Sequence, residues 1–307
     1  MNPLKGIALK LCAVVLFIVM SAMIKAASDH VPPGEAVFFR SAFAVPVILT
    51  WLWWRGDLRT GLRVKSPMGH FWRGFVGTTA MGLMFAGLGL LPLPEVTALG
   101  YTAPLLTVVF AAMFLDEKVG AFRISAVAVG LTGVLIVLSP RLTALSGPGL
   151  EMAQALGAVL VLLGATCAAL AQIYIRKLVR TEETSAIVFW FSMTSSALSL
   201  LTLPFGWVLP GIGELALLVL AGLIGGTAQI FLTASYRFAD ASVIAPFDYA
   251  SMLFALIIGY VIFDEVPTVP MLAGAALVIA AGIAIILRER HLGLQRDRAR
   301  EVRTPQG

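Results

Sequence analysis

Long apolar stretches alternate with short polar connections along almost the whole chain. A helix needs about 20 mostly apolar residues to cross the hydrocarbon core of a membrane, and the pattern predicts ten such spans. They are expected near residues 7–27, 34–54, 71–91, 95–115, 122–138, 154–174, 186–203, 213–236, 241–263 and 268–287. Pro and Gly punctuate the connections between them. The pattern therefore predicts an all-α integral membrane protein with ten transmembrane helices.

The composition agrees with this pattern. Of the 307 residues, 59% are hydrophobic and 13% are charged, and the mean hydropathy is +0.93, whereas about a quarter of the residues in a soluble domain are charged. The net charge of +5 is spread over short segments between the apolar stretches, so we expect no nucleic-acid partner. Cys12 and Cys167 lie within apolar stretches and lack metal-ligand spacing, so we expect neither a metal nor a cofactor.

Lys and Arg residues concentrate in alternate connections. Cytoplasmic loops hold the excess of these residues, and with the N-terminus inside only Arg141 falls in an outside loop. An even number of spans then predicts that both termini lie in the cytoplasm, with the chain in the inner membrane of a bacterium. Lys10 and Arg73 count among the cytoplasmic residues in this scheme, and residues 288–307 are expected to form a charged cytoplasmic tail.

The two halves of the chain show weak internal similarity. A shift of 148 residues aligns Tyr101, Leu105 and Asp116-Glu117 with Tyr249, Leu253 and Asp264-Glu265. A shift of 151 residues aligns Gly6, Val37, Phe38 and Ser41 with Gly157, Val188, Phe189 and Ser192. Because five spans are an odd number, the second half would enter the membrane from the opposite side. The sequence thus predicts two inverted five-helix repeats, residues 1–150 and 151–287, followed by the tail.

The end of each half carries the most specific motif, an apolar helix that closes with an acidic pair before a helix with glycines. These segments are Phe114-Leu115-Asp116-Glu117 before Gly130 and Gly133, and Ile262-Phe263-Asp264-Glu265 before Gly274 and Gly282. In these motifs the chain resembles the drug/metabolite transporter superfamily, specifically its EamA-type members, over about residues 4–288. The resemblance implies cytoplasmic termini, a central cavity between the halves, and transport of a small metabolite.

Two short segments narrow the resemblance. The opening Asn2-Pro3-Leu4-Lys5-Gly6 and the segment Phe38-Phe39-Arg40-Ser41 look like members described as riboflavin importers or S-adenosylmethionine transporters. Riboflavin uptake is the leading expectation. Transport of S-adenosylmethionine, amino acids or other metabolites, including export, remains as an alternative.

Charged groups within the predicted spans are candidates for function, because an ionisable side chain at the centre of a span costs about 2.5 to 3.5 kcal/mol on insertion scales. Arg40 and Asp248 are expected to be the deepest. Facing the cavity, Arg40 would offer a fork of donors and Asp248 an acceptor or proton carrier. Both break the internal symmetry, since Arg40 aligns with Phe191 and Asp248 with Gly100. The alternative is a structural role for each, and whether the two pair with each other stays open.

Aromatic and amide side chains complete the expected substrate-binding set. Tyr101 and Tyr249 occupy matching positions and would offer stacking faces to a flat solute. The other expected lining residues are Gln172, Trp190 and Gln229.

Several other positions predict local features of the helices. Lys25, Glu35 and Glu95 lie near the outer ends of spans and are expected to reach the interface, with Glu95 as a candidate gate or proton carrier. Pro46, Pro104 and Pro246 are expected to kink their helices. Gly222 and Gly226 predict a face for close helix packing.

The sequence contains no HExxH, Walker A or GxSxG motif. We therefore expect a secondary transporter that works by alternating access, and not an enzyme. A membrane-embedded enzyme or a scaffold is the rival class. The expected partners are a small solute and the lipid bilayer, and the chain is expected to act as a monomer or homodimer.

Overall fold

The computed structural model describes residues 3–58, 60–114, 120–143, 150–178, 181–238 and 245–303, and all regular secondary structure within these ranges is helical. In chain order the elements are α1 Pro3–Ala27, α2 Pro33–Ala42, α3 Ala44–Trp54, α4 Pro67–Leu90, α5 Leu93–Gly100, α6 Thr102–Phe114, α7 Ala121–Thr143, α8 Leu150–Leu178, α9 Thr184–Ser199, η2 Leu200–Phe205, α10 Ile212–Phe238, η3 Ala245–Tyr249, α12 Ala250–Phe263 and α13 Val269–Arg303. Helices suit an apolar environment because they satisfy every backbone polar group internally. Asp116-Glu117 lies outside the described residues.

Within the described residues, each predicted span coincides with one helix or with two consecutive helices; residue 115 and residues 241–244 of the predicted spans lie outside the described ranges. Seven described stretches are long and apolar enough to cross a membrane: Leu4–Ala27, Pro33–Trp54, Leu93–Phe110, Met152–Ile175, Thr184–Phe205, Ile212–Leu232 and Val269–Arg288. Ile124–Pro140 and Phe247–Phe263 are shorter apolar helices. The remaining helix, α4, has 24 residues but contains Arg73 and several glycines and threonines, which make it less apolar.

Three of the predicted spans are interrupted. The break between α2 and α3 lies at Phe43, shortly before Pro46, and the break between α5 and α6 lies at Tyr101, shortly before Pro104. The third interruption is the short 3-10 helix η3, which contains Pro246 and precedes α12. Proline lacks a backbone donor and clashes with the preceding turn, so the predicted kinks are confirmed.

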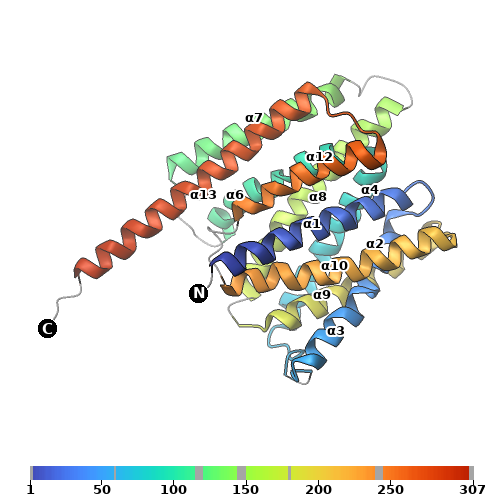
Figure 1. Ribbon diagram of the computed structural model, residues 1–307, viewed down its shortest axis with the longest axis horizontal. Coiled ribbons are helices and arrows are strands. Elements are labelled where there is room, and N and C mark those ends of the chain that lie inside the picture. The colour runs from blue at the N-terminus through green and yellow to red at the C-terminus, as the bar shows by residue number, and fades with distance from the viewer. Residues whose placement is uncertain are drawn as a thin grey trace.

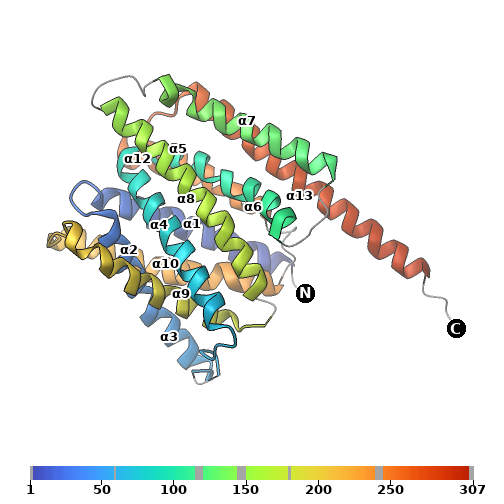
Figure 2. The same cartoon turned by 180° about the vertical axis from the view of Figure 1, so that it is seen from behind.

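The helices pack side by side in a bundle (Figures 1 and 2). The most extensive contacts join α1 to α10, α4 to α8, and α7 to α13. The pair α7 and α13 forms one edge of the bundle and α3 lies at the opposite edge. In both views α1 begins, and α13 ends, toward the same end of the molecule. The segment predicted as a tail continues α13 as a helix to Arg303.

Glycines bring several helix backbones close together. A Cβ atom at Gly133 of α7 would lie 2.7 Å from the carbonyl oxygen of Gly274 in α13, so neither position has room for a side chain. On α10, a Cβ at Gly222 would meet Phe43, and one at Gly226 would meet Ala44. The predicted close-packing face of α10 is therefore confirmed.

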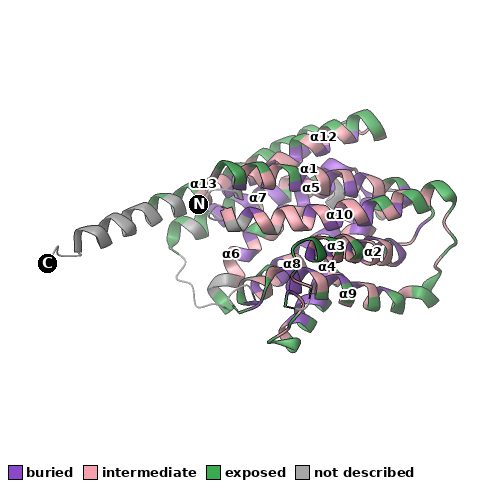
Figure 3. Ribbon diagram, turned by 60° about the horizontal axis from the view of Figure 1, so that its bottom comes forward, coloured by how far each residue is buried: buried purple, intermediate pink, exposed green. Residues whose placement is uncertain are grey.

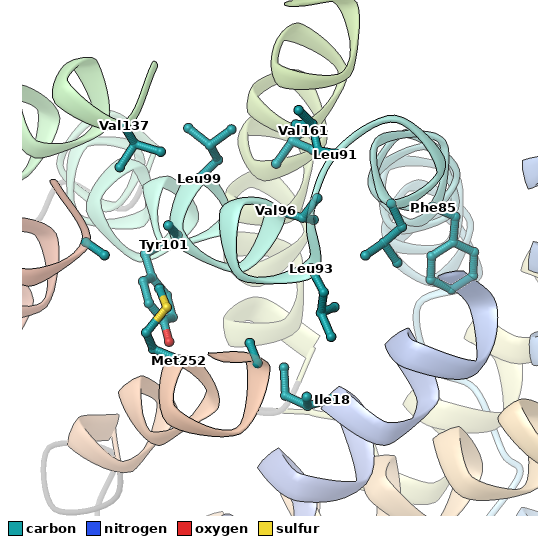
Figure 4. Packing of buried hydrophobic residues seen from close by; sticks show 14 of the residues in the cluster. Ile18, Phe85, Leu91, Leu93, Val96, Leu99, Tyr101, Val137, Val161 and Met252 are labelled. Carbon is teal, nitrogen blue, oxygen red and sulfur yellow. The ribbon is translucent and has the colours of Figure 1, made fainter. Parts of the chain in front are cut away.

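The core centres on the short helix α5, which is buried on nearly all sides. Buried residues line the interior, and exposed ones lie along the outside and at the helix ends (Figure 3). In Figure 4, Leu93 and Val96 of α5 lie between Val161 of α8 and Ile18 of α1, and Leu99 lies toward Val137 of α7. This packing carries Tyr101, directly after α5, into the interior beside α12.

Candidate functional site

Arg40 lies in the last turn of α2 and points into the bundle, where its residue is only 4% exposed. Its guanidinium carbon is 5.7 Å from the ring centroid of Phe191 on α9. The backbone of α10 approaches closely, since a Cβ at Gly225 would be 3.3 Å from Nε of Arg40. This Nε is buried and makes no hydrogen bond to the described part of the chain.

Arg73 of α4 reaches the same aromatic ring from another direction. Its guanidinium carbon is 3.4 Å from the ring centroid of Phe191, which is a stacking contact. Arg73 is 5% exposed, and its Nε and Nη1 atoms are buried without a hydrogen-bond partner among the described residues. The lack of a side chain at Gly77 leaves room for it, because a Cβ there would be 3.1 Å from Nη1. Arg40 and Arg73, the arginine pair, thus flank one ring.

The described residues supply no carboxylate within 4 Å of either guanidinium of the arginine pair. Glu182 lies at the same end of α4 but is engaged elsewhere. Its Oε1 atom accepts hydrogen bonds from the backbone N–H groups of Lys65 and Ser66, at 2.8 and 2.7 Å. Its Oε2 atom lies 3.7 Å from Nε2 of His70. The arginine pair is therefore a buried double positive charge that these ranges of the chain do not neutralise.

Asp248 has a cationic partner, and that partner is Lys10 rather than Arg40. The Nζ atom of Lys10, on α1, lies 2.7 Å from Oδ1 of Asp248 in η3. The Lys10 side chain is 2% exposed and the Asp248 side chain 45%. The open question of an Arg40–Asp248 pair is thereby answered in the negative.

Tyr101 and Tyr249 contact each other across the two halves. Their ring centroids are 5.0 Å apart in a T-shaped arrangement. The Tyr101 hydroxyl is 2.5 Å from the Ser251 hydroxyl, and the Ser251 hydroxyl donates to the backbone oxygen of Asp248. Tyr249 packs against Gly282 of α13. The two tyrosines thus hold α5, η3 and α13 together beside the Lys10–Asp248 pair.

The other predicted site residues are dispersed. Gln172 is exposed on α8, and Gln229 is half-buried on α10. Trp190 is 38% exposed, and its Nε1 donates to the backbone oxygen of Leu62 in the connection before α4. Glu95 is buried in the first turn of α5. The assignment of these four residues to the site therefore stays a prediction.

Lys25 joins three helices at the other end of α1. Its Nζ atom donates to the backbone oxygens of Leu88 and Leu91, at 3.1 and 2.7 Å, and lies 3.0 Å from Oε1 of Glu265. The Oε2 atom of Glu265 in turn accepts from the backbone N–H of Leu93. The prediction that Lys25, Glu35 and Glu95 extend to the interface is wrong, since all three side chains are largely buried. Glu35 accepts a hydrogen bond from the backbone N–H of Val208.

Sequence reasoning missed Lys10, Arg73 and Phe191 as interior residues. Lys10 and Arg73 were counted as cytoplasmic, but both are buried within helices. A signal was present, because both lie inside the predicted spans 7–27 and 71–91. Phe191 gave no such signal, since an aromatic residue in an apolar helix is ordinary.

The long apolar helices and the ionisable groups between them define a class, a multi-pass membrane protein with charge in its interior. The sequence profile of the EamA-like transporter family matches residues 4–139 and again residues 155–288. The chain belongs to this family, within the drug/metabolite transporter superfamily, and is a small-molecule membrane transporter. A profile of solute carrier family 35 also matches residues 95–205.

Relatives with different named solutes are about equally similar. A riboflavin transporter of Rhizobium johnstonii is 30% identical over 84% of this chain and 82% of its own length. A pseudopaline exporter of Pseudomonas aeruginosa is 30% identical over 91% of this chain and 95% of its own. An S-adenosylmethionine uptake transporter of Rickettsia prowazekii is 27% identical over 94% of each. Identity alone therefore leaves the solute unresolved.

A solved crystal structure shares the fold. Its chain is 21% identical to this one, with a TM-score of 0.66 over 94% of this chain and 98% of its own. The likeness extends over nearly the whole helical bundle.

Proposed function

We propose that this chain is a secondary transporter that moves a small metabolite across the inner membrane by alternating access between two inverted five-helix halves. The two matches of the family profile support a division into residues 1–150 and 151–287. The nine apolar stretches together with α4 give ten spans, five in each half. An odd number of spans inverts the second half relative to the first, as alternating access requires.

Reciprocal contacts between the halves support this proposal. Under the two sequence shifts, Gly77 corresponds to Gly225 and Phe191 corresponds to Arg40. A Cβ at Gly77 would be 2.9 Å from the Phe191 ring, and a Cβ at Gly225 would be 3.3 Å from Arg40. Each half thus places a glycine against the corresponding residue of the other half, so the contact is made twice with the roles of the halves exchanged.

A second contact obeys the same rule. Gly74 corresponds to Gly222, and Phe43 corresponds to Thr194. A Cβ at Gly74 would be 2.5 Å from Thr194, and a Cβ at Gly222 would be 2.5 Å from Phe43. Such reciprocity is expected of two halves related by a two-fold axis, and halves so related are able to exchange conformations.

The observation that carries the proposed transport function is the arginine pair in the interior. Buried ionisable groups within membrane helices mark solute and ion pathways. A membrane enzyme or a scaffold finds less support, because the relatives are named as transporters. We infer that solute binds near Arg40 and Arg73, and that the Lys10–Asp248 pair, which includes a residue of α1, is the candidate for ion coupling.

Riboflavin is the first candidate solute, because the chain is similar to a riboflavin transporter and holds aromatic rings near the interior charges. S-Adenosylmethionine is the second candidate, favoured by a specific observation. It carries a carboxylate that the two unneutralised guanidinium groups would bind, whereas riboflavin carries no ionised group at neutral pH.

Uptake of radiolabelled riboflavin, and in parallel of radiolabelled S-adenosylmethionine, tests the function in bacterial cells with and without this chain. The riboflavin assay uses a strain that cannot synthesise riboflavin. Saturable, chain-dependent uptake of either compound supports an importer. No uptake of either, with the protein demonstrably in the membrane, contradicts import of these solutes. Export is then tested by resistance of the cells to an excess of each compound.

The orientation is part of the proposal. The Lys and Arg distribution supports cytoplasmic termini, and the common end at which α1 begins and α13 ends agrees with an even number of spans. Reporter fusions to the two ends, active only in the cytoplasm, test this orientation. We propose a monomer or a homodimer as the working unit.

A further inference from the structure

We propose that Arg40 and Arg73 together bind a carboxylate of the transported solute, at the edge of the Phe191 ring. The inference rests on the proposed transport function and adds the chemical class of the solute. It follows from four features of this site: the absence of an internal counter-charge, the stacking of the guanidinium groups, the glycine backbones that lie against the charged heads, and the asymmetry of the two halves.

The first feature is the unused hydrogen-bonding capacity. Each guanidinium has five N–H donors, yet Nε of Arg40 and both Nε and Nη1 of Arg73 are buried without a hydrogen-bond partner among the described residues, and neither arginine forms an ion pair with a described carboxylate. Each uncompensated charge in a span costs about 2.5 to 3.5 kcal/mol on insertion scales. An anion held between the two groups supplies both the missing acceptors and the missing charge.

The second feature is the way in which Phe191 holds the two cations. A guanidinium stacked on an aromatic ring uses its face and leaves its N–H groups free in the plane. Arg73, at 3.4 Å from the centroid, is held in this way, and Arg40, at 5.7 Å, lies farther out. The ring thus orients donors without consuming them. A carboxylate, which accepts two parallel N–H bonds from an arginine, matches such donors.

The third feature is the close approach of two helix backbones to the charged heads. Gly77 of α4 and Gly225 of α10 lie against the guanidinium nitrogens of Arg73 and Arg40, where side chains would crowd them. Helix backbones, rather than side chains, therefore border the pair on two sides. Met20 of α1 completes this boundary, since a Cβ at Gly225 would be 2.7 Å from its sulfur.

The fourth feature is asymmetry. Both arginines belong to the first half, whereas the matching positions of the second half hold Phe191 and Ala221. The surrounding contacts repeat in both halves, so the scaffold alone does not require arginine at these positions. A solute with one charged end requires an asymmetric site of this kind.

Binding to the purified, detergent-solubilised full chain tests the proposal with matched probes. The probes are S-adenosylmethionine and its decarboxylated form, methionine and methionine amide, and riboflavin and riboflavin 5′-phosphate. Affinity is read from the concentration dependence of the melting temperature. We expect at least one carboxylate to bind the wild type, and its partner without the carboxylate to bind at least about tenfold more weakly, since hydrogen bonds to charged groups contribute about 1.5 to 3 kcal/mol.

The variants Arg40→Met and Arg73→Met should weaken binding of that carboxylate by about tenfold or more, and Arg→Lys should restore part of the affinity. Arg55→Gln is the matched control, because Arg55 also stacks on an aromatic ring, Trp51, but at an exposed position beside Asp57. Equal binding of a carboxylate and its partner without the carboxylate, unchanged affinity in both Met variants, or binding of no carboxylate at millimolar concentration overturns the proposal. Binding of riboflavin 5′-phosphate alone does so too, and assigns the pair to phosphate.

The uptake assay separates this inference from the proposed function. Arginine-dependent carboxylate binding without transport of the bound compound would keep the site and contradict the transport role. Saturable uptake of riboflavin that is unchanged in Arg40→Met and Arg73→Met would keep the transport function and overturn the carboxylate site.

Discussion

Lys10 and Arg73 are both cations buried in the same bundle, but the chain surrounds them differently. Lys10 is 2% exposed and has Asp248 at 2.7 Å. Arg73 is 5% exposed, stacks on Phe191 and has no carboxylate within 4 Å among the described residues. Helix α1 contributes to both regions. Lys10 lies on it, and Met20 lies about 15 Å farther along its axis. Met20 and Arg40 both lie against Gly225 of α10.

The difference indicates two roles for buried charge. An ion pair that is complete within the chain holds helices in register, as Lys10–Asp248 does for α1 and η3. A buried cation that lacks a partner lowers the stability of the fold until an anion binds to it. A ligand shifts the equilibrium between two conformations of a protein only if it binds them with different affinities. We therefore expect paired cations to control stability and the arginine pair to control solute affinity.

The largest effect is expected from Asp248→Asn, which removes the carboxylate beside the buried Lys10. We expect a loss of about 3 kcal/mol of stability, at the lower end for a broken buried pair because Asp248 is half-exposed. The melting temperature of the solubilised protein measures this loss. The double variant Lys10→Met/Asp248→Asn should recover most of it.

Asp248 is also the candidate proton carrier, and transport assays separate this role from stability. If it carries protons, Asp248→Asn abolishes gradient-driven uptake and leaves counterflow intact, as measured in proteoliposomes. Gradient-driven uptake by a folded Asp248→Asn protein would retire the coupling role and leave only the structural one.

A smaller loss is expected from Lys25→Met, which breaks a second complete set of partners. The change removes the ion pair with Glu265 and the hydrogen bonds to Leu88 and Leu91. With both side chains mostly buried, we expect about 2 kcal/mol of destabilisation and little change in solute affinity. Thermal unfolding and binding measured on the same preparation test this; an affinity loss as large as that of Arg73→Met would remove the distinction between the two regions.

Much of the fold follows from the sequence, because period and length of apolar stretches are properties of single segments. Where the chain is described, the predicted stretches coincide with helices, and breaks near Pro46 and Pro104 follow from the chemistry of proline. The family resemblance read from the Asp264-Glu265 motif is confirmed by the family profile.

The site was less predictable because partners come from distant segments. The sequence shows that Arg40 and Asp248 are charged residues within predicted spans. It does not reveal that Lys10, 238 residues earlier than Asp248, supplies the counter-charge of Asp248. Arg73 was counted as cytoplasmic because charge counting decides sides of the membrane and not burial. Tyr101 and Tyr249 were aligned with each other from the sequence, but only their packing reveals that they contact each other.

Mutation of the arginine pair should change stability in the opposite direction from Asp248→Asn and Lys25→Met, that is, it should stabilise the protein. Arg73→Met removes an uncompensated charge that costs about 2.5 to 3.5 kcal/mol and loses a stacking contact of about 2 kcal/mol. We expect a net gain of about 1 kcal/mol in the absence of solute, seen as a higher melting temperature. A clear destabilisation would mean that Arg73 is satisfied within the chain, and would make it a structural residue like Lys10.

The smallest expected effect is on binding of the carboxylate probe, and it tests the position of the Arg40 guanidinium rather than its charge. Gly225→Ala adds a methyl group 3.3 Å from Nε of Arg40 and 2.7 Å from the sulfur of Met20. The thioether of Met20 is flexible and can move aside, so the displacement falls on Arg40, whose donors shift by a few tenths of an ångström. We expect about threefold weaker binding of the carboxylate probe.

Gly213→Ala on the same helix is the matched control, because a Cβ at Gly213 meets no atom within 4 Å. That variant should bind the probe as the wild type does, and gain slightly in stability from the helix preference of alanine. If Gly225→Ala also binds normally while Arg40→Met does not, the guanidinium of Arg40 tolerates displacement. Its contribution would then be the positive charge alone, without directed hydrogen bonds, because only directed bonds depend so steeply on position.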